Sequence, residues 1–582
     1  SARALVLRGS SGAPPRLRGR LRRAGGPLRV LRAAARDRRR RRRHEHGRER
    51  RSRRGRPGAR VDARDRARGA RRMIRARLRL LTGRRRSYSF AAAPRRCVPA
   101  HLRALVAPSA ARLLLLATAV PAAGAEAVPA PPLPDAALVY ERRIQWPRAL
   151  RAAAGLPPAV ELAFSQRTRY ETVSHNWRRG QRPGRNDQLA LQSRLRLGAT
   201  RGGWSVLGEL QDARTAGARP DDFTGRMRNE ADLLQLFAAY RWAAGSGLHG
   251  DVHVGRFCID LGSTRLIGRN GYPNTTDSYE GVHMNLAPDD GAWRARALVV
   301  RPTRIRETRA DEGDPDQRLW GLALDRSETQ RVSSGVYLFG LRATPDGAAG
   351  RDRRLTTFGL RRLRRPVGPG EVRDADPGGA WDYEIEAIAQ FGERFDRDHA
   401  AWLAVASVGY TFGLPWRPRV EAEFLHASGT DDPAGDRSRS FDRLFGLRLF
   451  DLTQTSLYGP FGQTNHQLLG WRLDLRPSPR VTLGLKHHLN WLAEGRDGLD
   501  GSAVRGAPLA DPSGNAGRWL GHDVELTARY RVGPRLTLAG GFSYWFKGDW
   551  FDGLAQRPDR GGLPRGGEQD SAYFWLQSSI SF

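Results

Sequence analysis

The feature that most limits the fold of this chain is a two-residue alternation of apolar and polar side chains, which recurs from about residue 159 onward. In the segment 187–197, for example, Leu189 and Leu191 fall on one face, and Arg194 and Arg196 fall on the other. Because successive side chains of a β-strand point to opposite faces, this pattern predicts strands that have one apolar face.

About eighteen segments of this kind follow one another, separated by turns rich in Gly, Asp, Pro and Arg. They are 160–171, 187–197, 204–214, 232–242, 250–258, 278–287, 293–302, 333–343, 354–363, 381–391, 400–412, 418–427, 441–450, 468–476, 480–492, 523–532, 535–547 and 571–582, with a further candidate at 317–325. Short hairpins at 476–480 and 532–535 are expected on the periplasmic side, and long insertions at 305–331, 428–440 and 494–520 are expected as extracellular loops.

The length of these strands favours a membrane barrel over a soluble sandwich or propeller. Soluble strands average five or six residues, whereas membrane strands need about ten. The chain contains no run of 18 apolar residues and its mean hydropathy is −0.58, which argues against spanning helices. We therefore predict an all-β protein: a transmembrane antiparallel β-barrel of about 18 strands, preceded by a disordered N-terminal segment.

The strongly basic composition comes almost entirely from the first 125 residues. The chain has 99 Lys and Arg against 60 Asp and Glu, but residues 1–125 alone hold 38 basic and 5 acidic residues. The remainder is nearly neutral, at +6, so no nucleic-acid partner is expected for the fold. Residues 1–96 are Arg-rich without periodicity, which predicts a disordered segment that is absent from the mature protein. The alternative is a basic arm that binds nucleic acid.

Residues 97–125 have the pattern of a signal peptide. Arg103 and Arg112 precede the apolar run 113–120, and Ala123-Gly124-Ala125 supplies small residues for cleavage. The mature chain is then expected to comprise a short periplasmic lead-in at 126–158 and a barrel at 159–582. Export and a barrel together predict the bacterial outer membrane, with membrane lipid as a partner.

The final strand carries a row of apolar side chains. Phe574, Leu576, Ile580 and Phe582 occupy one face of the segment 571–582. A Phe that closes an alternating strand resembles the assembly signal of bacterial outer-membrane proteins, so the outer-membrane assembly machinery is an expected partner.

With the apolar faces toward lipid, the polar faces line the barrel interior and make a dry core impossible. The basic residues expected in this lumen are Arg167, Arg169, Arg194, Arg196, Arg361, Arg472, Lys486, Arg529 and Arg531. Guanidinium groups bind carboxylates in a bidentate manner, so such a wall would attract an anionic chain. The alternative is that Arg and Glu side chains on neighbouring strands only neutralise each other.

One stretch of the chain is Gly255-Arg-Phe-Cys-Ile-Asp260-Leu-Gly-Ser-Thr-Arg265-Leu-Ile-Gly-Arg269-Asn270, followed by Asn274-Thr-Thr-Asp-Ser-Tyr-Glu-Gly-Val282. It resembles the core signature of the alginate export family. Supporting pieces include Phe441-Asp-Arg-Leu-Phe445 and Tyr458-Gly-Pro-Phe-Gly462. The resemblance implies an outer-membrane barrel with an Arg-lined constriction that passes an anionic polysaccharide such as alginate, and possible periplasmic export partners. It also implies that Arg256, Asp260, Arg265 and Arg269 constrict or gate the pore.

Other chemistry has weaker support. His487 and His488 are adjacent on a strand and face opposite sides, and the loop Asp497-Gly-Leu-Asp500 lacks a full ligand set, so no cofactor is expected beyond a weak loop calcium. No G-x-S-x-G element occurs, and an enzyme is not expected. The open alternatives are a non-specific anion or solute porin, and a barrel-borne enzyme or adhesin that acts through extracellular loops.

Overall fold

The computed structural model describes most of the chain from Gly155 onward. The described residues are 155–181, 184–218, 226–245, 247–344, 352–367, 379–447, 452, 457–502 and 507–582. The predicted disordered segment 1–96, the signal peptide 97–125 and nearly all of the lead-in 126–158 lie outside these residues.

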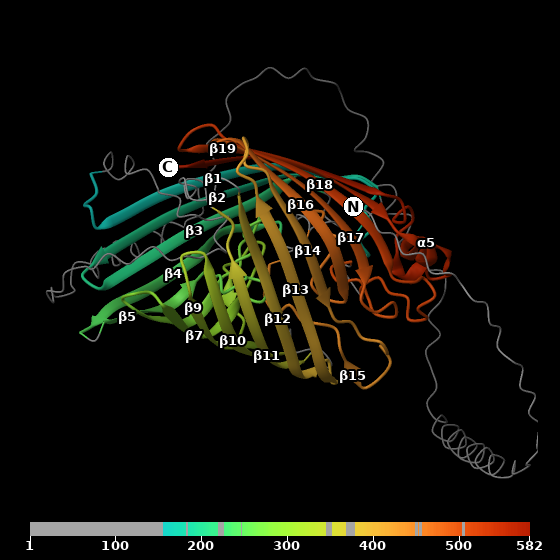
Figure 1. Cartoon of the computed structure of the whole chain (residues 1–582), viewed down its shortest axis with the longest axis horizontal. Helices are drawn as coiled ribbons and strands as arrows, with labels where there is room; N and C mark the ends of the chain where they lie inside the picture. The colour runs from blue at the N-terminus through green and yellow to red at the C-terminus, as the bar shows by residue number, and fades with distance from the viewer. Residues whose placement is uncertain are drawn as a thin grey trace, which may run out of the picture. The chain divides into compact units, whose positions relative to one another are not determined.

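Within these described residues, eighteen long antiparallel strands form one continuous sheet that closes on itself (Figure 1). They are β1 (Val160–Val173), β2 (Asn186–Arg201), β3 (Trp204–Ala216), β4 (Asn229–Ala244), β5 (Leu248–Phe257), β6 (Tyr279–Pro288), β7 (Trp293–Arg304), β9 (Gln317–Ser327), β10 (Val332–Ala343), β11 (Arg353–Arg364), β12 (Ala380–Arg394), β13 (Asp398–Thr411), β14 (Arg419–Ala427), β16 (His466–Ser478), β17 (Val481–Leu492), β18 (Trp519–Arg531), β19 (Leu536–Lys547) and β20 (Ser571–Ser581). Closure comes from the antiparallel pairing of β1 with β20, in which Thr168 lies opposite Ser578. The predicted barrel of about 18 strands is confirmed.

The connections at the two ends of the barrel differ in length. Seven of the eight at the end that holds the start of β1 and the end of β20 are tight, such as Gly202-Gly203; the connection between β11 and β12 is longer. The opposite end carries the long loops, with the two-residue strands β8 (Glu312–Gly313) and β15 (Arg437–Ser438), the helix α5 (Asp549–Gln556) and the 3-10 turn η3 (Arg560–Gly562). In Figure 1 the C-terminus marks the short-turn end, and α5 and β15 mark the long-loop end.

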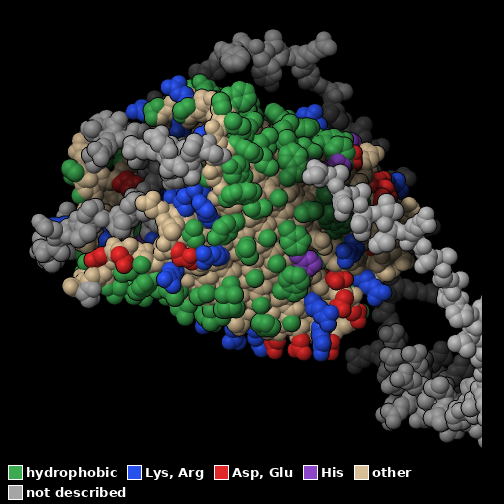
Figure 2. All heavy atoms as spheres, viewed as in Figure 1, with side chains coloured by type: hydrophobic (Ala, Val, Ile, Leu, Met, Phe, Trp, Pro, Cys, Tyr) green, Lys and Arg blue, Asp and Glu red, His purple; other side chains and the backbone are tan. Residues whose placement is uncertain are grey.

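The alternation in the sequence becomes an inside and an outside. Along β11, Phe358 and Leu360 are nearly half exposed on the outer face, while Leu355 and Thr357 are buried on the inner face. The outer faces of the other strands carry similar apolar residues, and Figure 2 shows hydrophobic side chains covering the wall in a broad band. An apolar outer band is what contact with the hydrocarbon layer of a membrane requires. Among the described residues no helix is long and apolar enough to cross a membrane.

One predicted strand is wrong and one additional candidate is real. Residues 441–447 of the expected strand 441–450 are not a strand, and 448–450 lie outside the described residues. Phe441 and Leu444 are instead buried in a loop. The alternation of apolar and polar residues at 441–447 arises because this irregular segment makes contacts on two sides. It does not reflect the pleated backbone of a strand. The candidate 317–325 forms β9, so the loop expected at 305–331 is shorter, at 305–316.

Loop 305–316 covers the part of β4 that has no neighbouring strand on one side. β5 is short, so its register with β4 starts only at Leu236, and the earlier residues of β4 have no partner on that side. The backbone N–H of Asp311 donates to Asp232 of β4 at 2.9 Å, and Asn229 Nδ2 donates to the Asp311 carboxylate at 2.9 Å. Burial, and secondarily the charge of Asp232, raises the pKa of Asp311 to about 7.

We expect Leu322→Arg, in the middle of the outer face of β9, to destabilise the barrel by about 2–4 kcal/mol, because it places a charge at the centre of the bilayer. Urea-induced unfolding in lipid vesicles measures this loss. Leu414→Arg, in the exposed turn after β13, is the control and should cost about 0–1 kcal/mol. Equal losses for both variants would contradict the placement of the apolar band.

We also expect loop 305–316 to loosen as pH rises through about 7. A carboxyl group whose folded-state pKa is raised favours the folded state while it is protonated, and this contribution disappears as it ionises beside Asp232. Hydrogen exchange of residues 305–316, corrected for the intrinsic rate, should be faster at pH 8 than at pH 6. Asp311→Asn, which mimics the protonated group, should remove the difference; a difference that persists would exclude Asp311 as its source.

Candidate functional site

The segment between β5 and β6, residues 258–278, leaves the wall and crosses the interior of the barrel; we call it the constriction segment. On one side it contacts the middle of β1. Arg167 donates to the carbonyl oxygens of Gly271 at 2.6 Å and Pro273 at 2.5 Å, and Arg169 donates to that of Tyr272 at 2.8 Å. Arg169 is fully buried and pairs with Glu171 at 2.6 Å.

On the other side the constriction segment reaches the middle of β12, the tenth strand from β1 in a wall of eighteen. Arg265 donates to Glu384 at 2.5 Å and to Glu386 at 2.6 Å, and Ser263 donates to Glu386 at 2.9 Å. Glu386 is buried and also accepts a hydrogen bond from Tyr337 at 2.7 Å. Contacts to opposite walls at mid-height show that this segment narrows the lumen.

Two further contacts fix the constriction segment. Within it, the Asp260 carboxylate accepts the backbone N–H of Arg269 at 2.9 Å and the Arg269 side chain at 2.7 Å. Near its end, Thr276 accepts a hydrogen bond from Arg194 of β2.

A second loop, residues 428–447, packs against the constriction segment from the long-loop end. Backbone hydrogen bonds join Phe445 N to Leu266 O at 2.9 Å and Leu447 N to Thr264 O at 2.8 Å. The approach is so close that a Cβ on Gly446 would lie 1.7 Å from the carbonyl oxygen of Arg265. Glycine is therefore required at this position.

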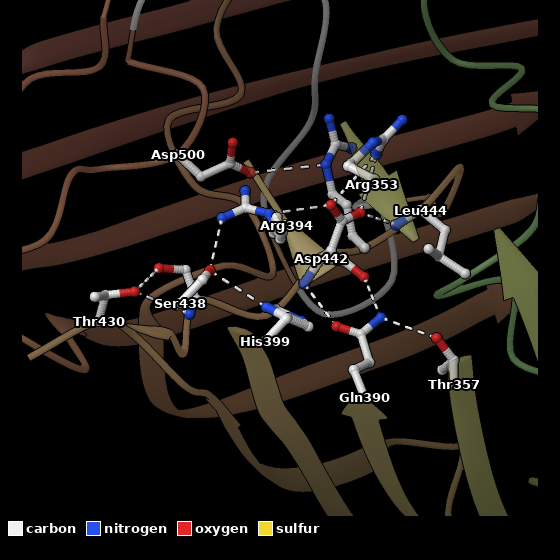
Figure 3. A network of polar contacts seen from close by, with 12 residues as sticks. Arg353, Thr357, Gln390, Arg394, His399, Thr430, Ser438, Asp442, Leu444 and Asp500 are labelled. Carbon is white, nitrogen blue, oxygen red and sulfur yellow. Dashed lines mark hydrogen bonds and ion pairs between the residues drawn. The ribbon is translucent and has the colours of Figure 1, made fainter. Parts of the chain in front are cut away.

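Asp442 holds loop 428–447 against the inner wall (Figure 3). Its carboxylate accepts hydrogen bonds from Arg353 of β11 and Arg394 of β12, both at 3.2 Å. Gln390 binds both backbone groups of Asp442, at 2.6 and 2.8 Å. Burial alone would raise the pKa of Asp442, but the two guanidinium groups more than offset it and hold that pKa below its usual value.

The wall arginines expected from the sequence lie beside carboxylates. Arg196 pairs with Glu209 at 2.8 Å, and Arg194 lies 3.9 Å from the same residue. Arg361 donates to Glu384 at 3.0 Å.

The same pattern continues on the next strands. Arg472 lies 3.6 Å from Glu421 and 3.7 Å from Glu423. Lys486 of β17 lies opposite Arg472 of β16 and opposite Glu525 of β18. A cavity of about 50 Å³ remains among Arg265, Arg472 and the glutamates of β12 and β14.

Arg529 and Arg531 are more exposed than these arginines. They occupy the inward positions of β18 near the short-turn end, in the same alternation as the buried Glu525, yet both are exposed. The inner face of β18 is therefore exposed to solvent toward the short turns, whereas inserted loops fill the lumen toward the other end.

Arg256 does not lie in the lumen, which corrects the expectation for it. In the sheet, Arg256 lies opposite Leu236 of β4 and Glu280 of β6. It is two residues from Val254 on β5, so it points to the same outer face as this exposed side chain. It pairs with Glu280 at 2.7 Å and donates to the carbonyl oxygen of Asp311 at 2.8 Å. The prediction failed because Arg256 precedes the point at which the chain turns inward.

The apolar residues of β20 match the expected pattern. Phe574 and Leu576 are exposed on its outer face, and the Phe582 ring stacks on Phe164 of β1 with centroids 6.4 Å apart. Their role as an assembly signal stays a prediction.

The candidate metal ligands are engaged by protein groups. His488 is buried against Glu423 at 2.7 Å, and His487 faces the other side, 3.1 Å from His522. Asp497 accepts the backbone N–H of Thr430 at 2.9 Å. Within the part of the chain that the structure describes, no group of three or more His, Cys, Asp or Glu is placed to hold a metal ion. The weak loop calcium stays a prediction.

Comparison with known proteins gives one family. The family model described as "Alginate export" matches residues 159–558. No curated protein matches the chain. Among solved structures, Pseudomonas aeruginosa OpdQ shares 11% identity with a TM-score of 0.46, covering 73% of this chain and 99% of its own. Pseudomonas aeruginosa OccD3 (OpdP) shares 13% identity with a TM-score of 0.46, covering 73% of this chain and 91% of its own.

We expect Glu386→Gln to release the constriction segment from β12. Removing Glu386 leaves Arg265 with Glu384 alone, which Arg361 shares, and the loss should approach but not exceed about 3–5 kcal/mol, the cost for a buried charge that loses its only partner. Trypsin should then cleave the folded barrel at Arg265 or Arg269 much faster than in the wild type, as followed by mass spectrometry.

The control is Glu393→Gln on the same strand, where the carboxylate is exposed and pairs with Arg354 at the rim. Cleavage at the wild-type rate is expected there. Protection of both variants alike would show that the contact with β12 does not hold the segment in place.

Proposed function

The chain belongs to the alginate export family, and from that membership and the geometry of its lumen we propose that it is an outer-membrane channel that passes an anionic polysaccharide or oligosaccharide such as alginate. The observation that carries the proposal is the constriction segment, which places Arg265 and Arg269 in the middle of a closed barrel beside carboxylates of the segment and the wall.

A lumen of paired charges suits passage better than tight binding. Each guanidinium can exchange a wall carboxylate for a carboxylate of the cargo, since both offer the same bidentate geometry. Glu384, Glu421 and Glu423 then compete with the cargo and prevent a long residence at any one arginine. A wall of unpaired arginines would instead hold a polyanion firmly.

The exposed Arg529 and Arg531 provide a site of capture. With long loops outside the cell, as in other outer-membrane barrels, the short-turn mouth faces the periplasm. Cations on a narrow mouth raise the local concentration of an anionic chain. Export from the periplasm through the constriction is the direction that this arrangement favours.

Assembly into the outer membrane, through a signal peptide and through recognition of the apolar row on β20, forms part of the proposal. Periplasmic export partners would contact the short-turn mouth. We propose no catalytic activity.

The test is the current through single barrels in planar bilayers. We expect anion-selective current that a polyuronate blocks, and we expect Arg529→Ala/Arg531→Ala to lower both the selectivity and the blocking affinity. Arg362→Ala/Arg364→Ala, which removes two charges from the outer face at the same end, is the matched control and should leave both unchanged.

The remaining outcomes distinguish the alternatives. Current without block by polyuronate would indicate a non-specific anion or solute porin. The absence of current would favour an enzyme or adhesin that uses the barrel only as an anchor. Equal effects of the two double variants would contradict capture at the inner mouth.

A further inference from the structure

A row of arginines lies on the outer face of the barrel at the long-loop end. Arg318 of β9 is opposite Arg342 of β10, and Arg342 is opposite Arg354 of β11. Arg301 of β7 continues the row, because its preceding residue Val300 is opposite Leu319 of β9. All four side chains are exposed. Neighbouring strands are about 4.8 Å apart, so the row is about 15 Å long.

This arginine row, Arg301, Arg318, Arg342 and Arg354, lies at the edge of the apolar band. The next outward positions toward the middle of the barrel are apolar or small, and they include Val299, Trp320 and Gly340. The Trp320 ring lies across Gly340, where a Cβ would come within 2.1 Å of it. Charged side chains that follow the last apolar outward positions of a barrel wall lie at the interface between hydrocarbon and headgroups. The arginine row is therefore at headgroup height.

The charge of the row is only partly compensated. Arg301 lies 3.4 Å from Glu280, and Arg354 lies 3.2 Å from Glu393. Among the residues that the structure describes, neither Arg318 nor Arg342 has an acidic partner. In Figure 2, charged side chains of both signs gather along the lower edge of the hydrophobic wall, where the strands β10–β12 end.

An apolar groove of about 450 Å³ lies in the same outer wall beside this level. Its lining includes Leu236, Val254 and Val282, which are outward-facing and 36%, 52% and 42% exposed. At one end of the groove stands the Arg256–Glu280 pair. The groove has the chemistry that an acyl chain requires, and the arginines have the chemistry that a phosphate requires.

We propose that the arginine row binds the phosphate groups of a phosphorylated glycolipid of the outer leaflet, a lipopolysaccharide, whose acyl chains lie along the wall and the groove. The proposal rests on the proposed orientation, with long loops outside the cell. It involves residues that take no part in the passage of cargo.

The test is titration of the detergent-solubilised barrel with lipopolysaccharide, with bound lipid measured by native mass spectrometry. Each arginine near an anionic lipid surface contributes about fivefold to affinity, so Arg318→Gln/Arg342→Gln should bind about 25-fold more weakly. Arg326→Gln/Arg364→Gln, on the outward positions of β9 and β11 at the other end, should bind as the wild type does. The same glycolipid without its phosphates should bind the wild type at least as weakly as the first variant binds the intact lipid, because that variant keeps Arg301 and Arg354.

Three results would overturn the proposal. One is equal affinity of the wild type and both double variants. Another is a loss confined to Arg326→Gln/Arg364→Gln, which would place the lipid at the short-turn end and reverse the orientation. The third is equal binding of the lipid with and without phosphate.

Bilayer current separates this proposal from the proposed channel. Arg318 and Arg342 are outside the lumen, so their double variant should conduct like the wild type whether or not the lipid binds. A normal current with lost lipid binding supports the lipid site, and a barrel that binds lipid but passes no current fails only as a channel.

Discussion

In a hydrocarbon layer the backbone N–H and C=O groups have no water to bind, so each must find a partner within the protein. An open sheet would leave two unpaired edges in lipid. The pairing of β1 with β20 removes both edges, although it joins residues about 400 positions apart in the chain. All else in the molecule depends on this closure: it creates a lumen, it separates an apolar outside from a polar inside, and it gives the inserted loops walls to hold.

Once the sheet is closed, the charges inside it must be compensated. Glu386 is buried, and it is tolerated there because Arg265, Ser263 and Tyr337 donate to it. Asp442 has a similar set of donors from β11 and β12. A buried charge without partners would cost far more than these pairs do. The loops are therefore not loosely placed lids, since they supply counter-charges that the wall requires.

The strands could be predicted because each carries its own pattern. The alternation in β2 or β12 is visible in ten residues, and it needs no knowledge of the rest of the chain. The same argument failed at 441–447, where alternating burial comes from a loop packed between two surfaces. It also failed for Arg256, whose face depends on where the chain leaves the wall. Which side of the lumen the constriction segment touches could not be inferred, because Arg265 and Glu386 are 121 positions apart and nothing local links them.

The constriction segment touches β1 and β12, which stand on opposite sides of the cylinder. It thus acts as a cross-brace as well as an obstacle. A barrel whose opposite walls are joined in this way resists flattening. Widening the lumen by loosening the constriction segment would therefore also make the cross-section of the barrel easier to deform. Engineering this protein to carry bulkier molecules would therefore also require changes that stiffen the β-strands of the wall.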